Sequence, residues 1–115
     1  MESTSAGEVV RRGFAAFERG DRDAIEAVLA EDFTFSSPPD PQLDRAGFFE
    51  RCWPNHERIR RYTFLRILED GGEVFVTYEL ENTDGKRGRN TEYFVVEDGR
   101  ITRQDVYFGP SLPAE

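Results

Sequence analysis

The sequence contains one cysteine and one histidine. A single cysteine excludes a disulfide within the chain, and these two residues alone cannot form a closed zinc site. No apolar run approaches the roughly 20 residues that a helix needs to cross a bilayer. The first four residues lack the basic start and the apolar stretch of a signal peptide. We therefore predict a cytoplasmic protein without metal or cofactor.

Basic residues are also few. The chain has 15 Lys and Arg against 23 Asp and Glu, a formal net charge of −8. Such a chain repels phosphate backbones and anionic lipid, so neither nucleic acid nor a membrane is an expected partner. Aromatic residues, by contrast, make up 13% of the 115 residues. This length predicts a single domain over 1–115, with a core at about 5–109 and a C-terminal tail at 110–115.

Two helices are expected first. The run Ser5-Ala6-Gly7-Glu8 is a capping box that begins the first helix. Three apolar residues then recur at i, i+4 and i+7 as one buried stripe: Val10, Phe14 and Phe17. Gly20 ends this helix, and Asp21 or Asp23 opens a second one. The apolar stripe of the second helix is Ile25, Val28 and Leu29.

A brief strand and a third helix are expected next. Phe33-Thr34-Phe35 alternates as a strand does. The proline cluster that follows stops it, because proline cannot donate to the ladder: Pro38, Pro39 and Pro41. Asp44 can cap a short helix that ends at Pro54. The apolar face of this helix holds Phe49, Cys52 and Trp53.

From about residue 60 the apolar period changes to near two, which predicts strands. Three turn signals divide this segment: Asp70-Gly71-Gly72, Asp84-Gly85 and Asp98-Gly99. We place four antiparallel strands at 60–69, 73–82, 88–97 and 100–109, and Gly109-Pro110 ends the last. Helices followed by a sheet indicate an α+β fold, with three helices packed in the concavity of a bent, mostly antiparallel sheet.

Large apolar residues fall on both faces of this predicted sheet. In strand 73–82 one face is apolar throughout: Val74, Val76, Tyr78 and Leu80. The opposite face carries Phe75 among polar residues. In the last strand the apolar side chains divide between the faces, with Val106 and Phe108 on one and Ile101 and Tyr107 on the other. A sheet with one solvated face would alternate more cleanly, so we predict a homodimer through the sheet. The alternative is a scatter of surface hydrophobic residues.

The register of the last hairpin decides which polar residues meet. A two-residue Asp98-Gly99 turn would place Glu97 opposite Arg100 and Glu92 opposite Asp105. A three-residue loop with Gly99 in the left-handed bulge position would instead place Glu92 opposite Gln104. We favour the second register, because it avoids opposed carboxylates. One face then carries a set of residues that the helices would enclose as a small-molecule cavity: Asn90, Glu92, Phe94, Thr102, Gln104, Val106 and Phe108.

Three runs carry a resemblance to a known family: Ala16-Phe17-Glu18-Arg19-Gly20-Asp21, Leu29-Ala30-Glu31-Asp32-Phe33 leading to Ser37-Pro38, and Glu97-Asp98-Gly99-Arg100-Ile101 through Val106-Tyr107-Phe108. From about Val9 to Phe108 the chain resembles the SnoaL-like branch of the nuclear transport factor 2-like superfamily. That cone-shaped, cystatin-like fold is shared with ketosteroid isomerase and limonene epoxide hydrolase. The stretch 37–54 looks like an uncharacterised bacterial subgroup. Because the fold hosts many functions, the resemblance implies a fold and a cone pocket rather than one activity.

The resemblance to the two enzymes is weak at their catalytic positions. Ser37 stands where the isomerase has its catalytic aspartate, and Gly13 stands where it has a tyrosine. Only its inward carboxyl on the third strand of the meander has a counterpart here, at Glu92. Val106 stands where the epoxide hydrolase has an aspartate. The resemblance therefore implies neither reaction by its known mechanism.

Glu92 is the candidate catalytic residue. In an apolar cone it would lose hydration and its pKa would rise, which suits a general acid or base. The alternatives are a solvated glutamate or one paired with Arg89 or Arg103. The residues expected to bind or orient a ligand are Phe14, Ser37, Phe49, Trp53, Tyr78, Asn90, Gln104, Val106 and Phe108. Trp53 either closes one end of the cone or simply packs in the core.

Two other chemistries are not expected. Cys52 and His56 lie four apart, but Pro54 between them breaks the helix that would bring them together. Asp40, Asp44 and Glu50 match no calcium-loop spacing, so no metal is expected. We therefore predict a small-molecule-binding protein that acts as a cofactor-independent isomerase, cyclase or hydrolase on a small apolar molecule. The alternative is a non-catalytic ligand-sensing or protein-interaction module that uses the cone or the outer sheet face.

Overall fold

The computed structural model describes residues 5–113. Within these residues, four helical segments and six strands follow one another: α1 (Ala6–Arg19), α2 (Arg22–Val28), β1 (Leu29–Ser37), β2 (Asp40–Asp44), α3 (Arg45–Arg51), the 3₁₀ helix η1 (Trp53–Arg58), β3 (Ile59–Asp70), β4 (Glu73–Asn82), β5 (Arg87–Glu97) and β6 (Arg100–Leu112). The strands form one sheet in the order β2-β1-β6-β5-β4-β3. Among the described strands, only β1 and β6 pair in parallel.

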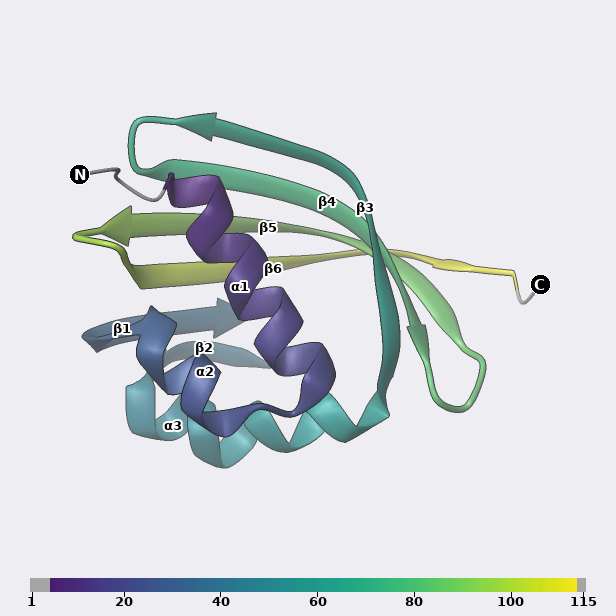
Figure 1. Ribbon diagram of the computed structural model, residues 1–115. Coiled ribbons are helices and arrows are strands. Elements are labelled where there is room, and N and C mark those ends of the chain that lie inside the picture. The colour runs from purple at the N-terminus through teal and green to yellow at the C-terminus, as the bar shows by residue number, and fades with distance from the viewer. Residues whose placement is uncertain (1–4, 114–115) are drawn as a thin grey trace.

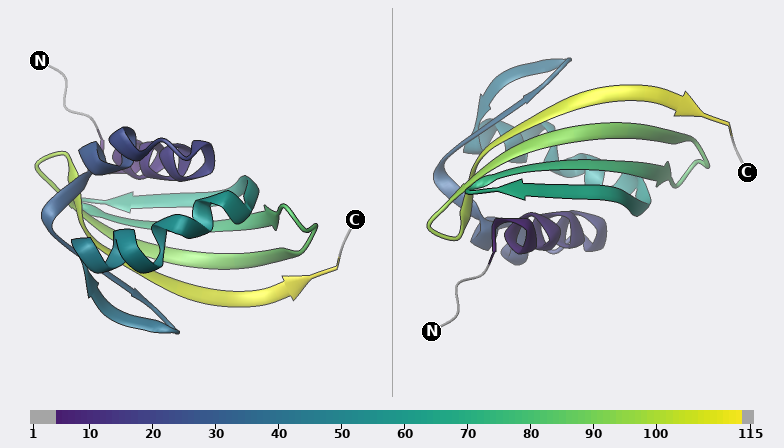
Figure 2. Two further views of the ribbon diagram at one scale, coloured as in Figure 1. Left: turned by 90° about the horizontal axis from the view of Figure 1, so that it is seen from below. Right: turned by 90° about the horizontal axis from the view of Figure 1, so that it is seen from above.

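The sheet is strongly curved, and the helices lie on its concave side. Figure 1 shows α1 crossing this face in front of β4 to β6, with α2 and α3 below it. Seen from below, α3 and η1 run across the sheet alongside α1 (Figure 2). The predicted α+β fold with helices in the concavity of a mostly antiparallel sheet is therefore confirmed. None of the described helices has the length and apolarity needed to cross a bilayer.

The predicted helix caps are present. The Ser5 hydroxyl accepts a hydrogen bond from the Glu8 N–H at 3.1 Å, as expected of a capping box. Gly20 ends α1 with a left-handed φ of 68°. Asp21, rather than Asp23, caps α2 by accepting from the Ala24 N–H. Asp44 caps α3 in the same way. These short-range signals depend only on neighbouring residues.

The segment between α2 and α3 differs from the prediction. Leu29 begins β1 rather than ending α2, and β1 is longer than the expected 33–35. After a turn at Pro38 and Pro39 the chain returns as β2, a strand that the sequence analysis missed. This strand contains Pro41, which is tolerated because β2 lies at the edge of the sheet.

The favoured register of the last hairpin is wrong. Glu97 pairs with Arg100, so the turn has two residues, and both Asp98 (φ 51°) and Gly99 (φ 76°) are left-handed. A β-bulge at Thr102 then shifts the register. Glu92 consequently lies opposite Val106, neither Gln104 nor Asp105. The bulge removes the direct contact between carboxylates that argued against a two-residue turn.

The same bulge changes which residues face the helices. Ile101 was predicted to share a face with Tyr107, but it is buried in the core. Gln104, Val106 and Phe108 keep their predicted place on the face of Asn90, Glu92 and Phe94, with which they pair. Thr102 leaves this set, because its hydroxyl donates to the Val95 carbonyl at 3.3 Å.

Strand β6 also runs past its predicted end. Gly109-Pro110 was expected to stop it, but Ser111 pairs with Gly88 and β6 continues to Leu112. Between the pairs Gly88–Ser111 and Asn90–Phe108, β6 has one residue more than β5, which makes a second bulge. A bulge is a place where proline is accepted in a sheet. Part of the predicted tail at 110–115 is therefore strand, and residues 114 and 115 lie outside the described range.

The core lies between α1 and the inner face of the sheet. Phe14 on α1 is its centre, because its ring makes edge contacts with four other rings at centroid distances of 5.0 to 5.8 Å: Tyr62, Phe64, Tyr78 and Phe94. Such edge-to-face packing is the favoured geometry for aromatic pairs. The rings do not fill the cone, because Phe14, Tyr62 and Tyr78 also line a cavity.

Candidate functional site

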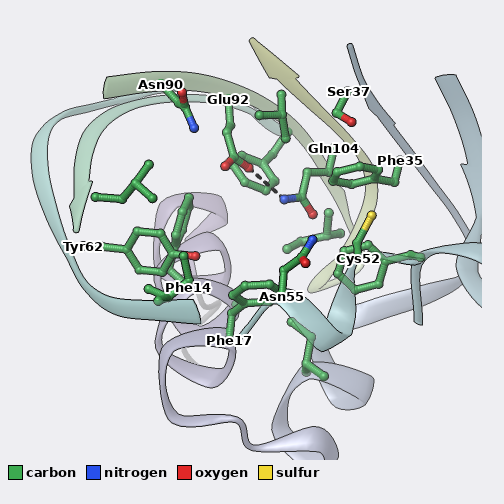
Figure 3. Close-up of a pocket in the computed structure, with 18 of the residues that line it drawn as sticks. Phe14, Phe17, Phe35, Ser37, Cys52, Asn55, Tyr62, Asn90, Glu92 and Gln104 are labelled. Atoms are coloured by element: carbon green, nitrogen blue, oxygen red, sulfur yellow. Dashed lines mark hydrogen bonds between the residues drawn. The ribbon is translucent and has the colours of Figure 1, made fainter. Parts of the chain in front are cut away.

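A cavity of about 260 Å³ lies between the helices and the concave face of the sheet (Figure 3). Most of its wall is apolar, including Phe14, Phe17 and Phe35. Nine side chains in the wall can form hydrogen bonds or carry a thiol: Ser37, Asp40, Cys52, Asn55, Tyr62, Tyr78, Asn90, Glu92 and Gln104. An apolar cavity with a few convergent polar groups is the usual form of a small-molecule site.

Glu92 is the central polar group of this cavity. Its side chain is only 5% exposed, although it lies on β5 in the middle of the wall. The Tyr78 hydroxyl, from the neighbouring strand β4, donates a hydrogen bond to Oε2 of Glu92. Gln104 on β6 donates through Nε2 to Oε1 at 2.7 Å. Each carboxyl oxygen therefore has one protein donor, and the group is held from both sides.

The protonation of Glu92 is set by burial. Loss of hydration raises the pKa of Glu92 from its ordinary value of 4.5 to about 7, although the hydrogen bonds from Tyr78 and Gln104 act to lower it. Burial and the nearby Glu92 charge raise the pKa of Tyr78 well above its ordinary value. At neutral pH the tyrosine thus keeps its proton, while Glu92 is divided between its two forms. A carboxyl in this state can accept or release a proton.

Asn90 links this pair to the second bulge of β6. Its Nδ2 donates to the Tyr78 hydroxyl at 3.3 Å, and its Oδ1 accepts from the Gly109 N–H at 3.3 Å. The backbone at the bulge therefore orients Asn90, which in turn orients Tyr78. The arrangement needs glycine at 109, because a Cβ there would lie 2.2 Å from the Arg89 carbonyl oxygen.

Eight of the predicted site residues lie in the cavity wall: Phe14, Ser37, Tyr78, Asn90, Glu92, Gln104, Val106 and Phe108. Phe108 is 59% exposed, which places it where the wall meets solvent. Gly13 and Ser37, the two positions that depart from the isomerase pattern, also line the cavity. The alternatives for Glu92, a solvated side chain or a pair with Arg89 or Arg103, do not hold. Those arginines bind Glu79 and Asp105 instead.

Phe49 and Trp53 were expected in the wall but lie outside it. The prediction assumed one helix through residue 53, whereas α3 ends at Arg51 and the chain continues as a 3₁₀ helix. Cys52, which was predicted on the same face as these two, does line the cavity, and Phe48 lines it in place of Phe49. Trp53 packs against Phe17, with the ring centroids 5.6 Å apart. Phe49 is covered by the guanidinium of Arg22, 3.9 Å from its ring centroid.

A family model of the SnoaL-like domain matches residues 10–104. The chain belongs to the SnoaL-like domain family. A search among curated proteins finds no match. Three solved structures illustrate what the SnoaL-like chain is similar to. A protein from Kribbella flavida DSM 17836 is 21% identical at a TM-score of 0.84, with 93% of this chain and 88% of that chain covered.

The second structure is an NTF2-like protein of unknown function from Cytophaga hutchinsonii ATCC 33406. It is 25% identical at a TM-score of 0.75, with 96% of each chain covered. The third is a candidate ketosteroid isomerase from Kribbella flavida DSM 17836, 20% identical at a TM-score of 0.78, with 96% of this chain and 82% of that chain covered. These likenesses show a common fold for the SnoaL-like chain and its neighbours.

Several wall residues of the SnoaL-like domain were not anticipated, chiefly Tyr62 and Asn55. Tyr62 alternates with Phe64 in the predicted first strand of the meander, a signal that could have placed it on the inner face. Asn55 lies in η1 after Pro54, where no periodic pattern exists. In Figure 3 both side chains point into the cavity.

Cys52 lines the cavity but is not an activated nucleophile. Burial, followed by the charge of Asp40, raises the pKa of its thiol to about 11. His56 lies against Trp53, with the ring centroids 4.5 Å apart. Within residues 5–113 no hydrogen bond joins Cys52 to His56. No group of three or more metal-ligating side chains occurs in that range either.

Proposed function

We propose that the cavity binds a small, mostly apolar molecule and that Glu92 transfers a proton to or from it. One observation carries the proposal: a carboxyl with a pKa of about 7 is buried in an apolar cavity and oriented by two donors. Structural carboxylates in proteins are more often solvated or paired with a cation. Neither describes Glu92, and perturbed groups of this kind cluster at functional sites.

The chemistry available is acid–base catalysis without a cofactor. The ionised Glu92 would take a proton from a carbon next to a ligand carbonyl, and the C–H electron pair would form the enolate. Returning the proton to a different carbon completes an isomerisation. Attack of the enolate carbon on a second carbonyl of the ligand forms a ring, and the protonated Glu92 returns its proton to the new alkoxide. If Glu92 instead takes a proton from water, the hydroxide adds to a ligand ester carbonyl, the C–O bond of the ester breaks, and the alcohol leaves with the proton from Glu92. The likeness to a candidate ketosteroid isomerase supports the first of these classes.

Exchange of carbon-bound hydrogen tests this proposal without knowledge of the natural substrate. A suitable probe is 2-tetralone, a bicyclic ketone whose acidic C–H groups exchange with D₂O and are followed by NMR. The wild-type protein should accelerate exchange near pH 7, and Glu92→Gln should abolish the acceleration, since an amide is not a base at this pH. The matched control is Glu50→Gln, which changes an exposed glutamate of α3. Equal acceleration by wild type and Glu92→Gln would contradict the proposal.

We also propose that two copies of the chain associate through the outer face of the sheet. Three large apolar side chains are exposed there, which we call the outer patch: Leu68 (56% exposed), Phe75 (48%) and Tyr107 (56%). Leu68 and Phe75 pair directly across β3 and β4. Charges of both signs lie beside the patch, as in the Arg103–Asp105 ion pair at 2.9 Å. Such a face is complementary to a second copy of itself.

A cytoplasmic location also stays a prediction.

A further inference from the structure

The cavity wall carries hydrogen-bonding atoms that the protein itself does not satisfy. Tyr78, Asn90 and Glu92 bond to one another, to Gln104 or to the backbone. The Tyr62 hydroxyl and the side-chain oxygen of Gln104, by contrast, have no hydrogen-bond partner within residues 5–113. Figure 3 shows both groups pointing into the cavity. The Tyr62 hydroxyl can donate or accept a hydrogen bond and the Gln104 oxygen can only accept one, so both are available to a ligand.

Tyr62 is held firmly enough to serve this purpose. Its backbone N–H donates to the carboxylate of Glu18 on α1 at 3.2 Å. Its ring makes edge contacts with Phe14 and Tyr78, at centroid distances of 5.0 and 5.3 Å. Burial, followed by the charges of Glu92 and Glu18, raises the pKa of Tyr62 well above its ordinary value. The hydroxyl therefore stays protonated, and it can donate a hydrogen bond from a fixed position in the wall.

The charge of the wall restricts the ligand further. Among residues 5–113, no lysine, arginine or histidine lines the wall. Its only carboxyls are Glu92 and Asp40, and Asp40 already binds Arg51 at 2.6 Å. An anionic ligand would be buried without a counter-charge and close to Glu92. Burying an unpaired charge is strongly unfavourable, so the wall selects against carboxylates and phosphates.

We propose that the ligand is a neutral ring compound that carries a carbonyl oxygen and a hydroxyl group. The carbonyl accepts from the Tyr62 hydroxyl, and the ligand hydroxyl donates to the side-chain oxygen of Gln104. The cavity volume of about 260 Å³ lies just below the usual range of roughly 300–1,000 Å³ for small-molecule sites, so the compound is small, with one or two rings. This inference rests on the proposed use of the cavity as a ligand site and names the class of ligand.

Three matched probes test it by affinity, measured with NMR titration near pH 6.5, where the phenol of the ketone probe keeps its proton. They are 4-hydroxyacetophenone, which has both groups, its anionic analogue 4-hydroxybenzoate, and the hydrocarbon 4-ethyltoluene. We expect 4-hydroxybenzoate to bind at least about tenfold more weakly than 4-hydroxyacetophenone. Tyr62→Phe keeps the ring contacts and removes only the donor, so it should weaken the binding of 4-hydroxyacetophenone by roughly threefold to tenfold. It should change the affinity for 4-ethyltoluene by less than about twofold. The control Tyr93→Phe removes a hydroxyl from the outer face, where it bonds Glu73 at 2.6 Å, and should change neither affinity.

Any of three results would overturn the inference. These are no binding of 4-hydroxyacetophenone, equal or tighter binding of 4-hydroxybenzoate, and a Tyr62→Phe effect that is the same for the ketone and the hydrocarbon. The readout is affinity and involves no turnover. The ligand class can therefore fail while proton transfer by Glu92 stands. Conversely, Glu92→Gln can leave hydrogen exchange unchanged, against the proposed function, while the pattern of affinities supports the ligand class.

Discussion

The Gln104 side chain reaches Glu92 diagonally across β5 and β6, with Nε2 and Oε1 2.7 Å apart. The register pairs Gln104 with Phe94 and Glu92 with Val106, so the two are not directly opposite. Diagonal neighbours on one face of a sheet are within reach of a long side chain. The bulge at Thr102 creates this relationship, because without it Asp105 would stand opposite Glu92. The bulge thus puts Val106 opposite the buried carboxyl, where a second carboxyl would otherwise have been, and brings the Gln104 donor within reach of it.

The stability of the fold should depend on the protonation of Glu92. Its folded pKa of about 7 lies above its ordinary 4.5, so the folded chain binds more protons between these values. The contribution of Glu92 to the free energy of unfolding is therefore fully present below pH 4.5 and lost as the pH rises through 7. The loss is on the order of 3 kcal/mol.

Urea unfolding of wild type and Glu92→Gln at about pH 4.5 and about pH 9 checks this. Glutamine does not titrate, so the free energy of unfolding of Glu92→Gln, relative to that of wild type, should rise by about 3 kcal/mol from about pH 4.5 to about pH 9. Glu50→Gln, at an exposed position, should show a nearly constant difference from wild type. A Glu92→Gln difference that does not change with pH would contradict the raised pKa.

The Tyr78 hydroxyl should hold the pKa of Glu92 below the value that burial alone would give. Tyr78→Phe removes this donor from the ionised carboxyl and should raise the pKa of Glu92 by about one to two further pH units. The measurement is a titration of the ¹³C carboxyl signal. Tyr93→Phe serves as the control, since its hydroxyl lies on the other face of the sheet. An unchanged or lower pKa in Tyr78→Phe would show that the hydroxyl does not stabilise the carboxylate.

Much of the fold could be predicted because its signals are local. Ser5, Gly20 and Asp44 act on backbone groups within a few residues, and the three glycine turns divide the meander without tertiary information. The edge strand β2 could not be anticipated from its own composition. It contains Pro41, and only its place at the edge of the sheet makes that residue acceptable.

The site was predictable where alternation within one strand decides it. Asn90, Glu92 and Phe94 share a face whatever the register, and they do line the cavity. Ile101 could not be placed, because the bulge at Thr102 reverses the alternation and depends on pairing with another strand. Phe49 and Trp53 do not line the cavity for a similar reason, and Trp53 packs in the core, which is the alternative left open for it. Their shared face exists only if the helix continues beyond Arg51.

The second bulge of β6 should tolerate no side chain at residue 109. A Cβ on Gly109 would lie 2.2 Å from the Arg89 carbonyl oxygen, so the strands must separate. Gly109→Ala should lower the free energy of unfolding by roughly 1–3 kcal/mol, measured with urea. Gly88→Ala, across the same pair of strands, meets only the Pro110 carbonyl oxygen at 3.8 Å and should change stability by less than about 0.5 kcal/mol. Equal effects of the two substitutions would argue against the close approach at Gly109.

Association of two copies should depend on Phe75. A lysine at this position would place a charge in the centre of the outer patch, where a partner would have to bury it without a counter-charge. In sedimentation velocity we expect wild type to have twice the mass of one chain and Phe75→Lys to have the mass of one. Ala46→Lys adds the same charge at an exposed position of α3 and should stay a dimer. A wild-type chain that sediments as a monomer at micromolar concentration would rule out the dimer. A Phe75→Lys dimer would instead place the interface on another face of the molecule.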